Sequence, residues 1–260
     1  MPFDYAKDNM ERRPYEFYIE EYRQADPIEI SNRLGIAYDV QKSEFIIFFM
    51  GVNYHVSYPD FRVSHEETEM CFYPLKEDIY AKILVLRYLL NASVFPYNGD
   101  FRAYRELPSG ELYYRQFQGR CIFRLNRKYG NRLETMERIM DTLGAAQVHM
   151  ADKGYELEIF ENFYLRFLFW EGDEEFPASS QILFSSNFPA SFDAYDLAEV
   201  GEICINAFDE IEGKSTLCAV PSMNIGNAHS NYSNKLWRQI RMRKNHSQVY
   251  RSAGSDCTEE

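Results

Sequence analysis

The sequence predicts an α+β fold in which antiparallel sheet packs against several helices. Two observations lead to this prediction. Aromatic residues make up 16% of the 260-residue chain, and such side chains fit half-buried strands as well as hydrophobic cores. Short β-rich runs also alternate along the chain with longer segments whose apolar residues recur at helical spacing. With 45% hydrophobic residues, the chain can bury a large core in a single domain.

The first elements are predicted to be two helices. Residues 14–24 form the first of them. In the shorter second helix, Asp26 suits the N-cap and Pro27 the first helical position. Gly35 suits the position just past its end, where the backbone often becomes left-handed.

Three β-rich runs then predict an antiparallel meander. They cover residues 36–40, 44–50 and 53–57. Pro74 begins the most regular helical pattern of the chain, which continues to Asn91. We expect this helix to lie against the sheet.

Residues 93–110 contain two prolines and two glycines, and they predict a long loop. Loops longer than about 12 residues in a compact domain are often functional. Residues 112–129 then predict a helix, and residues 131–143 predict another, which ends before Gly144.

A second group of strands and a final helix complete the predicted domain. The strands cover residues 147–150, 156–160, 163–170 and 179–184. The helix covers residues 193–211, with Asp193 as its N-cap. After Gly213 the sequence loses its periodicity and gains Ser and Asn, which predicts a linker. The chain therefore divides into an N-terminal helical segment (1–24), an α+β domain (25–212), and a linker with a basic tail (213–260).

Charge is unevenly distributed along the chain. The formal net charge is −12, yet six basic and no acidic residues lie between His229 and Ser255. The rest of the chain is therefore strongly acidic, and it should repel nucleic acid and anionic lipid. We expect the tail to be disordered. The alternative is that it contacts nucleic acid or a membrane surface, with Trp237 as an interfacial anchor.

The cysteines and the N-terminus favour a reducing, cytoplasmic location. The five cysteines are widely separated and odd in number, and the first ten residues are charged rather than apolar. Cys121 and Cys204 fall in predicted apolar helices, so we expect them to be packed rather than reactive. No uncharged apolar run approaches the roughly 20 residues of a membrane span. The protein is therefore expected to be soluble.

The most informative motif is Trp170-Glu171-Gly172-Asp173-Glu174-Glu175-Phe176-Pro177, which places four carboxylates in a turn directly after an apolar run. One interpretation is a site for a divalent cation or cationic ligand, held by Asp173, Glu174 and Glu175. The other is a hairpin turn whose carboxylates are solvated or paired with arginines. Consecutive residues of a strand point to opposite faces, so neighbouring carboxylates share one ion only where the backbone bends.

The loop of residues 95–110 carries the second candidate site. Its arginines could bind an anion or a cofactor through bidentate contacts, or they could anchor the loop to acidic neighbours. We predict a bridge from Arg105 to Asp173 or Glu174, which would join the loop and the acidic turn as one face of a pocket. The expected ligand-binding residues are Tyr97, Arg102, Arg105, Glu106, Trp170, Asp173 and Glu174.

Three segments together resemble a known family. They are Tyr88-Leu89-Leu90-Asn91-Ala92, then Gly99-Asp100-Phe101-Arg102 with Arg105-Glu106-Leu107-Pro108-Ser109-Gly110-Glu111-Leu112-Tyr113-Tyr114, and Trp170-Glu171-Gly172-Asp173-Glu174-Glu175-Phe176-Pro177-Ala178 with Ile182-Leu183-Phe184. In them the chain is similar to an uncharacterised domain family, a catalogued domain of unknown function, of anaerobic bacteria and archaea. The resemblance covers residues 25–211.

The resemblance implies an accessory role in anaerobic cofactor metabolism. Some family members are similar to proteins encoded near corrinoid-dependent methyl-transfer systems, and some carry a cysteine-rich iron-sulfur segment. This chain has no closely spaced cysteines, so it cannot provide the clustered thiolates that an iron-sulfur cluster requires.

No common catalytic motif accompanies these features. The chain has no Gly-x-Ser-x-Gly elbow, no Gly-x-Gly-x-x-Gly loop and no Gly-x-x-x-x-Gly-Lys loop. The sequence therefore identifies no catalytic residue and no cofactor. We interpret the protein as a cytoplasmic ligand-binding or accessory protein for an unknown small molecule or protein partner. The alternatives are a metal-dependent enzyme that uses the acidic turn with Glu106, and a protein-interaction module with no small-molecule site.

Overall fold

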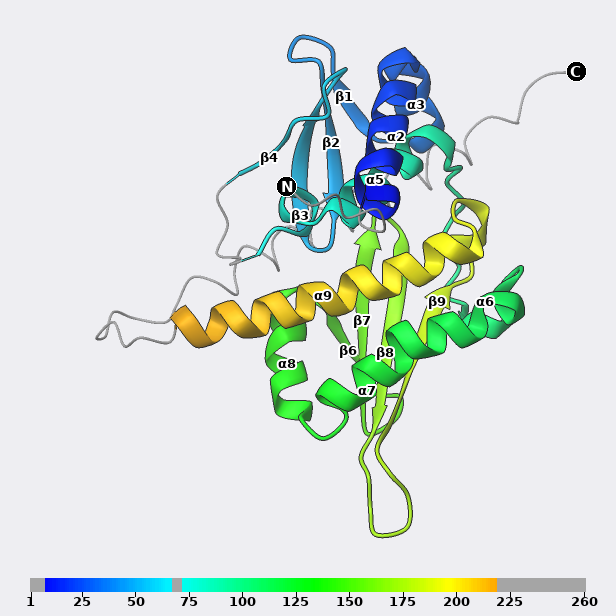
Figure 1. Cartoon of the computed structure of the whole chain (residues 1–260), viewed down its shortest axis with the longest axis vertical. Helices are drawn as coiled ribbons and strands as arrows, with labels where there is room; N and C mark the ends of the chain where they lie inside the picture. The colour runs from blue at the N-terminus through cyan, green and yellow to red at the C-terminus, as the bar shows by residue number, and fades with distance from the viewer. Residues whose placement is uncertain (1–7, 67–71, 219–260) are drawn as a thin grey trace, which may run out of the picture. The chain divides into compact units, whose positions relative to one another are not determined.

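The computed structural model describes residues 8–66 and 72–218, which fall in one compact unit. The fold is α+β, as predicted: within these residues, nine strands form one antiparallel sheet against which helices pack (Figure 1). The predicted basic tail lies outside the described residues. The elements follow in the order η1 (Asp8–Arg12), α2 (Arg13–Gln24), α3 (Pro27–Leu34), β1 (Ala37–Asp39), β2 (Glu44–Phe49), β3 (Val52–Ser57), β4 (Val63–His65), α4 (Pro74–Glu77), α5 (Ile79–Asn91), β5 (Phe101–Ala103), η2 (Tyr104–Glu106), α6 (Gly110–Phe117), η3 (Gln118–Ile122), α7 (Phe123–Tyr129), α8 (Leu133–Thr142), β6 (Ala146–Val148), β7 (Lys153–Phe160), β8 (Phe163–Trp170), β9 (Ser179–Ser185), η4 (Phe188–Ala190) and α9 (Ala194–Cys218).

Both predicted N-terminal helices are present. α2 begins one residue earlier than predicted. Asp26 caps α3, because its side chain accepts hydrogen bonds from the backbone N–H groups of Ile28 and Glu29. Gly35 has φ +66°, the left-handed conformation that ends a helix at little steric cost for glycine.

The predicted helix from residue 74 is divided into two helices. α4 ends at Glu77, and Asp78 has an extended backbone conformation. The Asp78 side chain caps α5 by accepting a hydrogen bond of 2.8 Å from the Tyr80 N–H. The apolar periodicity continues across this break, so the sequence pattern did not reveal it. The preceding strands confirm the predicted meander, to which β4 adds a fourth strand.

The predicted loop of residues 93–110 has structure of its own. β5 pairs with β9, η2 follows it, and α6 already begins at Gly110. The helix predicted for residues 112–129 is confirmed: α6, the π-helical η3 and α7 follow one another without a break. The packing predicted for Cys121 and Cys204 is confirmed, since both thiols are free and buried. Burial raises the pKa of each thiol above its usual value.

The second strand group and the final helix are also present. β6, β7, β8 and β9 confirm the four predicted strands, with ends that differ by up to three residues. Asp193 caps α9 as predicted, since its side chain accepts the Asp196 N–H at 2.9 Å. α9 continues to Cys218, so residues 213–218, which we predicted as linker, are helical.

The sheet consists of two halves joined at one place. The strand order is β4-β3-β2-β7-β8-β9-β5, with β1 paired to β2 and β6 paired to β7. β2 and β7 connect the halves, and their register contains one residue pair, Phe49 and Phe160. The Met50 N–H also donates to the Ile159 carbonyl at 2.9 Å. So short a pairing contributes little energy, and side-chain packing must hold the halves together.

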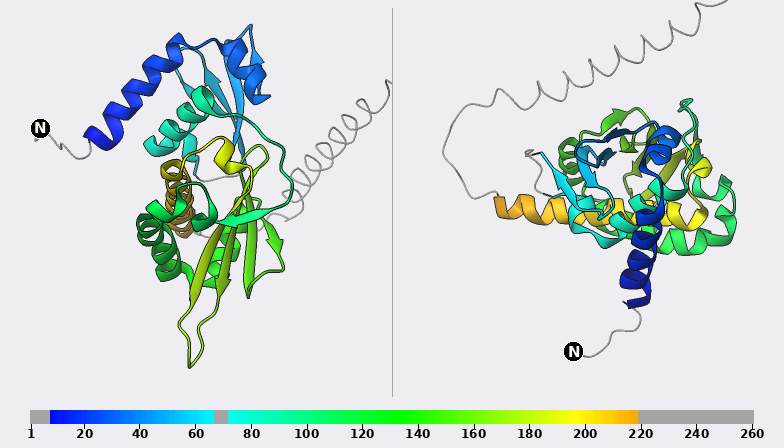
Figure 2. Two further views of the ribbon diagram at one scale, coloured as in Figure 1. Left: turned by 90° about the vertical axis from the view of Figure 1, so that its right-hand side faces the viewer. Right: turned by 90° about the horizontal axis from the view of Figure 1, so that it is seen from above.

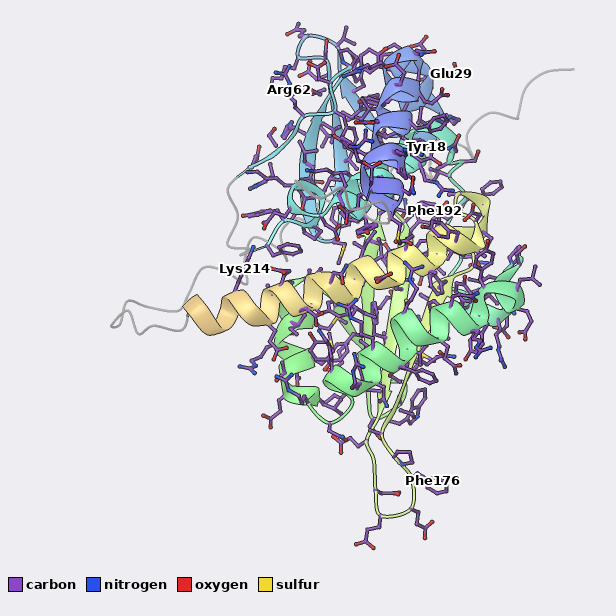
Figure 3. The ribbon with its side chains drawn as sticks, viewed as in Figure 1. Tyr18, Glu29, Arg62, Phe176, Phe192 and Lys214 are labelled. Carbon is purple, nitrogen blue, oxygen red and sulfur yellow. The ribbon has the colours of Figure 1, made fainter. Side chains whose placement is uncertain are left out.

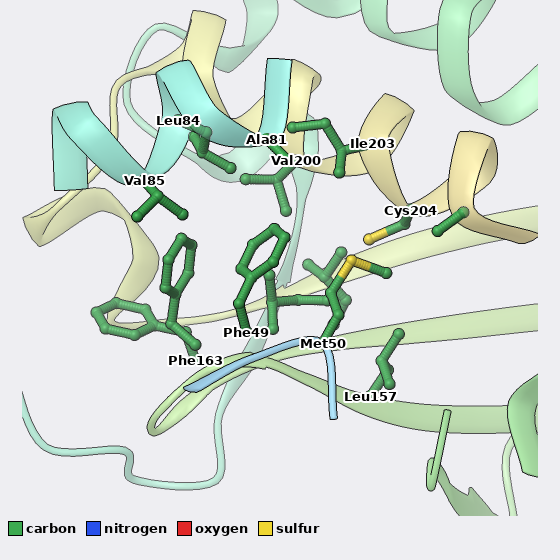
Figure 4. Packing of buried hydrophobic residues seen from close by; sticks show 14 of the residues in the cluster. Phe49, Met50, Ala81, Leu84, Val85, Leu157, Phe163, Val200, Ile203 and Cys204 are labelled. Carbon is green, nitrogen blue, oxygen red and sulfur yellow. The ribbon is translucent and has the colours of Figure 1, made fainter. Parts of the chain in front are cut away.

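Aromatic packing supplies that connection. The Phe160 ring stacks on Tyr88 of α5 and on Phe192, with distances between ring centroids of 4.5 Å and 5.4 Å. It also contacts the ring of Phe49 of β2, at a centroid distance of 5.0 Å. Figure 4 shows Leu84 and Val85 of α5, with Val200 and Ile203 of α9, facing Phe49 and Phe163. The helices α5 and α9 therefore cover the junction between the two halves.

The half formed by β5 to β9 has two unlike faces. On the inner face, Phe163, Leu165, Phe167 and Phe169 of β8 are buried in the core. The helices α7, α8 and α9 lie on this side (Figure 2). The other face, which we call the outer face, carries the alternate residues of β8, namely Tyr164, Arg166, Leu168 and Trp170.

α9 carries an acidic stripe that is paired with basic residues of neighbouring helices. The acidic residues are spaced by three or seven positions, so each is adjacent to the next along a row that winds around the helix. Their pairs are Arg87 with Asp193 and Asp196, Arg120 with Glu199 and Glu202, Arg124 and Lys128 with Asp209, and Arg132 with Glu212. Much of the negative charge of α9 is thus compensated within the fold.

We predict that Phe160→Ala destabilises the protein by about 3–5 kcal/mol, because it leaves a cavity where the two half-sheets meet. Urea unfolding followed by circular dichroism measures the loss. Phe123→Ala is the matched control: Phe123 is 59% exposed, and its loss should stay below about 0.5 kcal/mol. A loss below about 1 kcal/mol for Phe160→Ala would contradict the role given to this stack.

We predict a pH dependence of stability from Asp196, which is 5% exposed. Burial raises the pKa of Asp196 to about 7, although the Arg87 guanidinium at 2.8 Å opposes the shift. The pKa of Asp196 in the folded protein is above its unfolded value near 3.9. The stabilisation from the protonated Asp196 is therefore complete below about pH 3.9, and it is lost as pH rises through about 7. Between about pH 5 and 8, wild type should therefore lose stability relative to Asp196→Asn. A constant difference in urea unfolding would contradict this.

Candidate functional site

The hairpin loop that joins β8 to β9 (residues 171–178) projects from the sheet. Figure 3 shows Phe176 near the far end of this projection. Residues 171–177 are all exposed. Hairpin connections are commonly two to five residues long, so this loop is longer than the chain reversal requires.

Backbone hydrogen bonds define the conformation of the hairpin loop. The Asp173 N–H donates to the Phe176 carbonyl at 2.9 Å. The Asp173 carboxylate accepts from the N–H groups of Glu175 at 2.8 Å and Phe176 at 2.7 Å. These two donors lower the pKa of Asp173, since they favour its charged form. At Gly172 a Cβ would lie only 2.7 Å from the Ala178 nitrogen, so the two arms of the loop approach closely.

Two side chains from other elements anchor the base of the hairpin loop. The Glu171 N–H donates to the Asp152 carboxylate at 2.8 Å. On the opposite arm, the Asn126 amide of α7 donates to the Ala178 carbonyl at 2.8 Å. The base is therefore held from both sides, and the orientation of the loop is set by the body of the protein.

The hairpin loop combines negative charge with exposed aromatic rings. It contains four carboxylates and no basic residue. Trp170, the last residue of β8, is 39% exposed, and Phe176 is 67% exposed. Carboxylates and exposed aromatic faces are both favourable partners for ammonium and guanidinium groups.

A cleft of about 560 Å³ lies beside the base of the hairpin loop. The turn between α7 and α8 and the start of the loop form it, with the lining residues Gly130, Asn131, Arg132, Leu133, Glu134, Thr135, Glu171 and Gly172. Arg132 is at the same time paired with Glu212 of α9. The cleft is polar and contains both charge signs, so its lining alone does not favour one class of ligand.

The predicted site residues of the loop 95–110 have other partners. Arg105 lies 3.8 Å above the Tyr114 ring and pairs with Glu111 at 3.4 Å. The Glu106 carboxylate accepts the Ala103 N–H at 2.8 Å. Arg102 is exposed on the edge strand β5. These contacts stabilise the segment around η2.

The predicted bridge from Arg105 to Asp173 or Glu174 is wrong. β5 pairs with β9 from Leu183 onward, whereas Trp170 pairs with Ser179 at the other end of β9. The rise of a strand places these points about 13 Å apart, and the hairpin loop extends further away. The two motifs therefore do not form one face of a pocket. Sequence reasoning could not place them, because strand register is not visible in either motif.

Two of the predicted residues nevertheless share the outer face. Tyr97 packs on Tyr164 at 4.5 Å, and Trp170 lies six residues further along β8 on the same side. Arg166, between them, was not identified from the sequence. Its guanidinium lies 3.7 Å above the Phe101 ring and pairs with Glu156 at 2.8 Å. The alternation of residues along β8 was the signal that could have found it.

The metal hypothesis finds no geometric support in the part of the chain that the structure describes. There, no group of three or more His, Cys, Asp or Glu side chains could hold a metal ion. One Asp173 oxygen accepts both backbone N–H groups of the turn.

Among the helices that the structure describes, none is long and apolar enough to cross a bilayer.

Comparisons with known proteins identify one family. A family model with the description Domain of unknown function (DUF3786) matches residues 26–207. This confirms the resemblance to a catalogued domain of unknown function. No curated protein and no solved structure matches the chain.

We predict that Gly172→Ala disturbs the hairpin loop without unfolding the protein, because the new Cβ would clash with the Ala178 nitrogen at an exposed site. Amide exchange in residues 170–178 should accelerate about tenfold, while the urea midpoint stays unchanged. Gly213→Ala in α9 is the control, since no atom lies within 4 Å of its Cβ position. It should stabilise the helix by up to about 1 kcal/mol. Unchanged exchange in Gly172→Ala would contradict the close approach.

Proposed function

This chain belongs to the family of the Domain of unknown function (DUF3786), and we propose that it is an accessory protein that binds a cationic group of a partner through its hairpin loop. The family description names no activity. The proposal therefore comes from the loop and its base, where Trp170, Asp173 and Glu174 are residues that we predicted from the sequence.

The fixed presentation of the hairpin loop is the observation that carries the proposal. A loop that only joined two strands would not need the Asp173 turn, the close approach at Gly172 and the anchors from Asp152 and Asn126. Together these contacts hold four carboxylates and two exposed aromatic rings in one projecting unit. Preorganisation of this kind lowers the entropic cost of binding.

The chemistry of the hairpin loop favours a cationic occupant. Glu171, Glu174 and Glu175 are exposed and can pair with ammonium or guanidinium groups, and Trp170 and Phe176 offer ring faces to the same groups. The net charge of −12 would also attract a basic partner over some distance, mainly at low salt. A lysine- or arginine-containing segment of another protein combines these requirements.

This geometry favours the interaction module among the functions that the sequence left open. Arg102 and Arg105 are far from the acidic turn, so the proposed site no longer includes an arginine pocket for an anion. The link to corrinoid-related metabolism stays a prediction from the resemblance. We would therefore include corrinoids, flavins and nucleotides beside cationic ligands in a thermal-shift panel on the full chain.

We predict that the variant Glu171→Gln, Glu174→Gln, Glu175→Gln binds a labelled hexa-arginine peptide about 3- to 150-fold more weakly than wild type. Three exposed ion pairs of about 0.2–1 kcal/mol each are lost, and 1.4 kcal/mol corresponds to a factor of ten. Fluorescence anisotropy at low salt measures the dissociation constant. Asp173 is kept, because its carboxylate holds the turn.

The matched control removes the same number of negative charges, three, at positions outside the hairpin loop. Glu20, Glu21 and Glu29 are exposed on α2 and α3, and their substitution by Gln leaves the hairpin loop intact. Equal weakening in both triple variants would show that the peptide responds to the overall charge, and it would refute the hairpin loop as the site.

A further inference from the structure

The outer face of the half-sheet has the composition of a protein-binding surface. Protein interfaces are enriched in Tyr, Trp, Phe, Met and Arg, and their strongest contributors are Trp, Tyr and Arg. The outer face carries these residue types in neighbouring positions, namely Tyr97, Phe101, Met150, Tyr164, Arg166 and Trp170. A sheet face that only faced solvent would carry a larger share of unpaired charged residues.

Leu168 shows that this face has an apolar centre separate from the core. It is 4% exposed, yet it does not belong to the core cluster that contains Leu165, Phe167 and Phe169. Its neighbours across the strands are Gly154 and Gln181. Side chains of this face therefore pack over Leu168, on a side of the sheet that helices do not cover within residues 8–66 and 72–218 (Figure 2).

The charged groups of the outer face already have hydrogen-bonding partners. Arg166 donates to Glu156 at 2.8 Å, lies over Phe101, and approaches the Met150 sulfur at 3.6 Å. Glu158 accepts a hydrogen bond from the Tyr164 hydroxyl at 3.2 Å. Because these charges have partners, covering the face would leave few of them desolvated without compensation.

The outer face leads directly to the acidic hairpin loop. Tyr164 and Trp170 are six residues apart on β8, which is about 20 Å along the strand. Beyond Trp170 the chain enters the loop with its four carboxylates. The surface is thus mainly aromatic over one stretch and strongly negative at one end. This uneven distribution of charge restricts which ligands can bind along its length.

Two backbone groups near the adjacent edge of β9 are occupied by side chains. The Ile182 N–H is held by the Gln181 side chain at 3.2 Å, and the Ala178 carbonyl by Asn126 at 2.8 Å. Side-chain contacts with the face are therefore favoured over extension of the sheet at these two positions.

From these observations we infer that the outer face binds a polypeptide segment of a partner protein, with its apolar and aromatic residues over Tyr164 and Trp170 and its lysine or arginine residues at the hairpin loop. The inference rests on the proposed function, and it adds the partner class and the direction in which the segment lies. A small cation would need the loop alone. A span of about 20 Å instead requires an extended chain of about six residues, or a helix whose axis is about 20 Å long.

A displayed library of random twelve-residue peptides, selected on the full chain, tests the inference. The enriched peptides should carry a basic cluster on one side of an apolar or aromatic stretch. Tyr164→Ala should weaken the best peptide at least tenfold, and Trp170→Ala provides a second variant at a more exposed position. Tyr113→Ala is the matched control, since Tyr113 is 41% exposed on α6, and it should leave binding unchanged.

The outcomes separate this inference from the proposed function. Weakening by both the Tyr164→Ala variant and the triple Gln variant supports both. Weakening by the triple Gln variant alone leaves the hairpin loop as a cation site and overturns the outer face as a peptide site. Weakening by Tyr164→Ala alone overturns the role of the hairpin loop, and with it the inferred orientation of the peptide with its basic residues at the loop. A selection that enriches no peptide with a basic cluster on one side of an apolar or aromatic stretch also overturns the inference.

Discussion

The arrangement of the whole domain depends on the junction between its two half-sheets. β2 and β7 share one registered pair, Phe49 and Phe160, so backbone pairing cannot hold the halves together. The connection comes from aromatic and aliphatic packing between Phe160 and the side chains of α5 and α9. Since the helices that close this junction must all lie on the inner side of the sheet, the outer face of β8 is left to the surface. The open face is thus a consequence of how the core is built.

Electrostatics divides the acidic residues into two groups with different roles. The acidic stripe of α9 is paired with arginines and a lysine of α5, η3, α7 and the turn before α8, so its charges join helices to one another. Breaking such partly buried pairs would leave charges without compensation. The carboxylates of the hairpin loop are exposed and concentrated in eight residues. Four carboxylates are therefore displayed together at one end of the outer face.

The hairpin loop and the outer face belong to one continuous strand, and this links their proposed roles. β8 contributes Phe167 to the core, Leu168 to the outer face, and Trp170 to the base of the loop. A partner that covered the outer face would thus contact a strand whose opposite side is fixed in the core. Such a surface changes little on binding, which keeps the entropic cost of association low.

The sequence by itself determined those features that depend on neighbouring residues. Asp26 and Gly35 marked the ends of α3, Asp193 marked the start of α9, and the hydrophobic periodicity located the strands β7, β8 and β9. It also selected the acidic turn. Each of these signals acts within a few residues, where capping and side-chain alternation operate.

Only the tertiary structure decided how distant segments meet. The partner of Arg105 is Glu111 and not Asp173, because the register of β5 on β9 sets which residues of the two motifs are neighbours. The break at Asp78 and the short strand β5 depend on contacts that periodicity does not report. The position of Arg166 over Phe101 likewise requires two strands from distant parts of the chain. Tyr97, Trp170 and the acidic turn were predicted from the sequence, whereas Arg166 and the assembly of these residues beside one face depended on non-local pairing and packing.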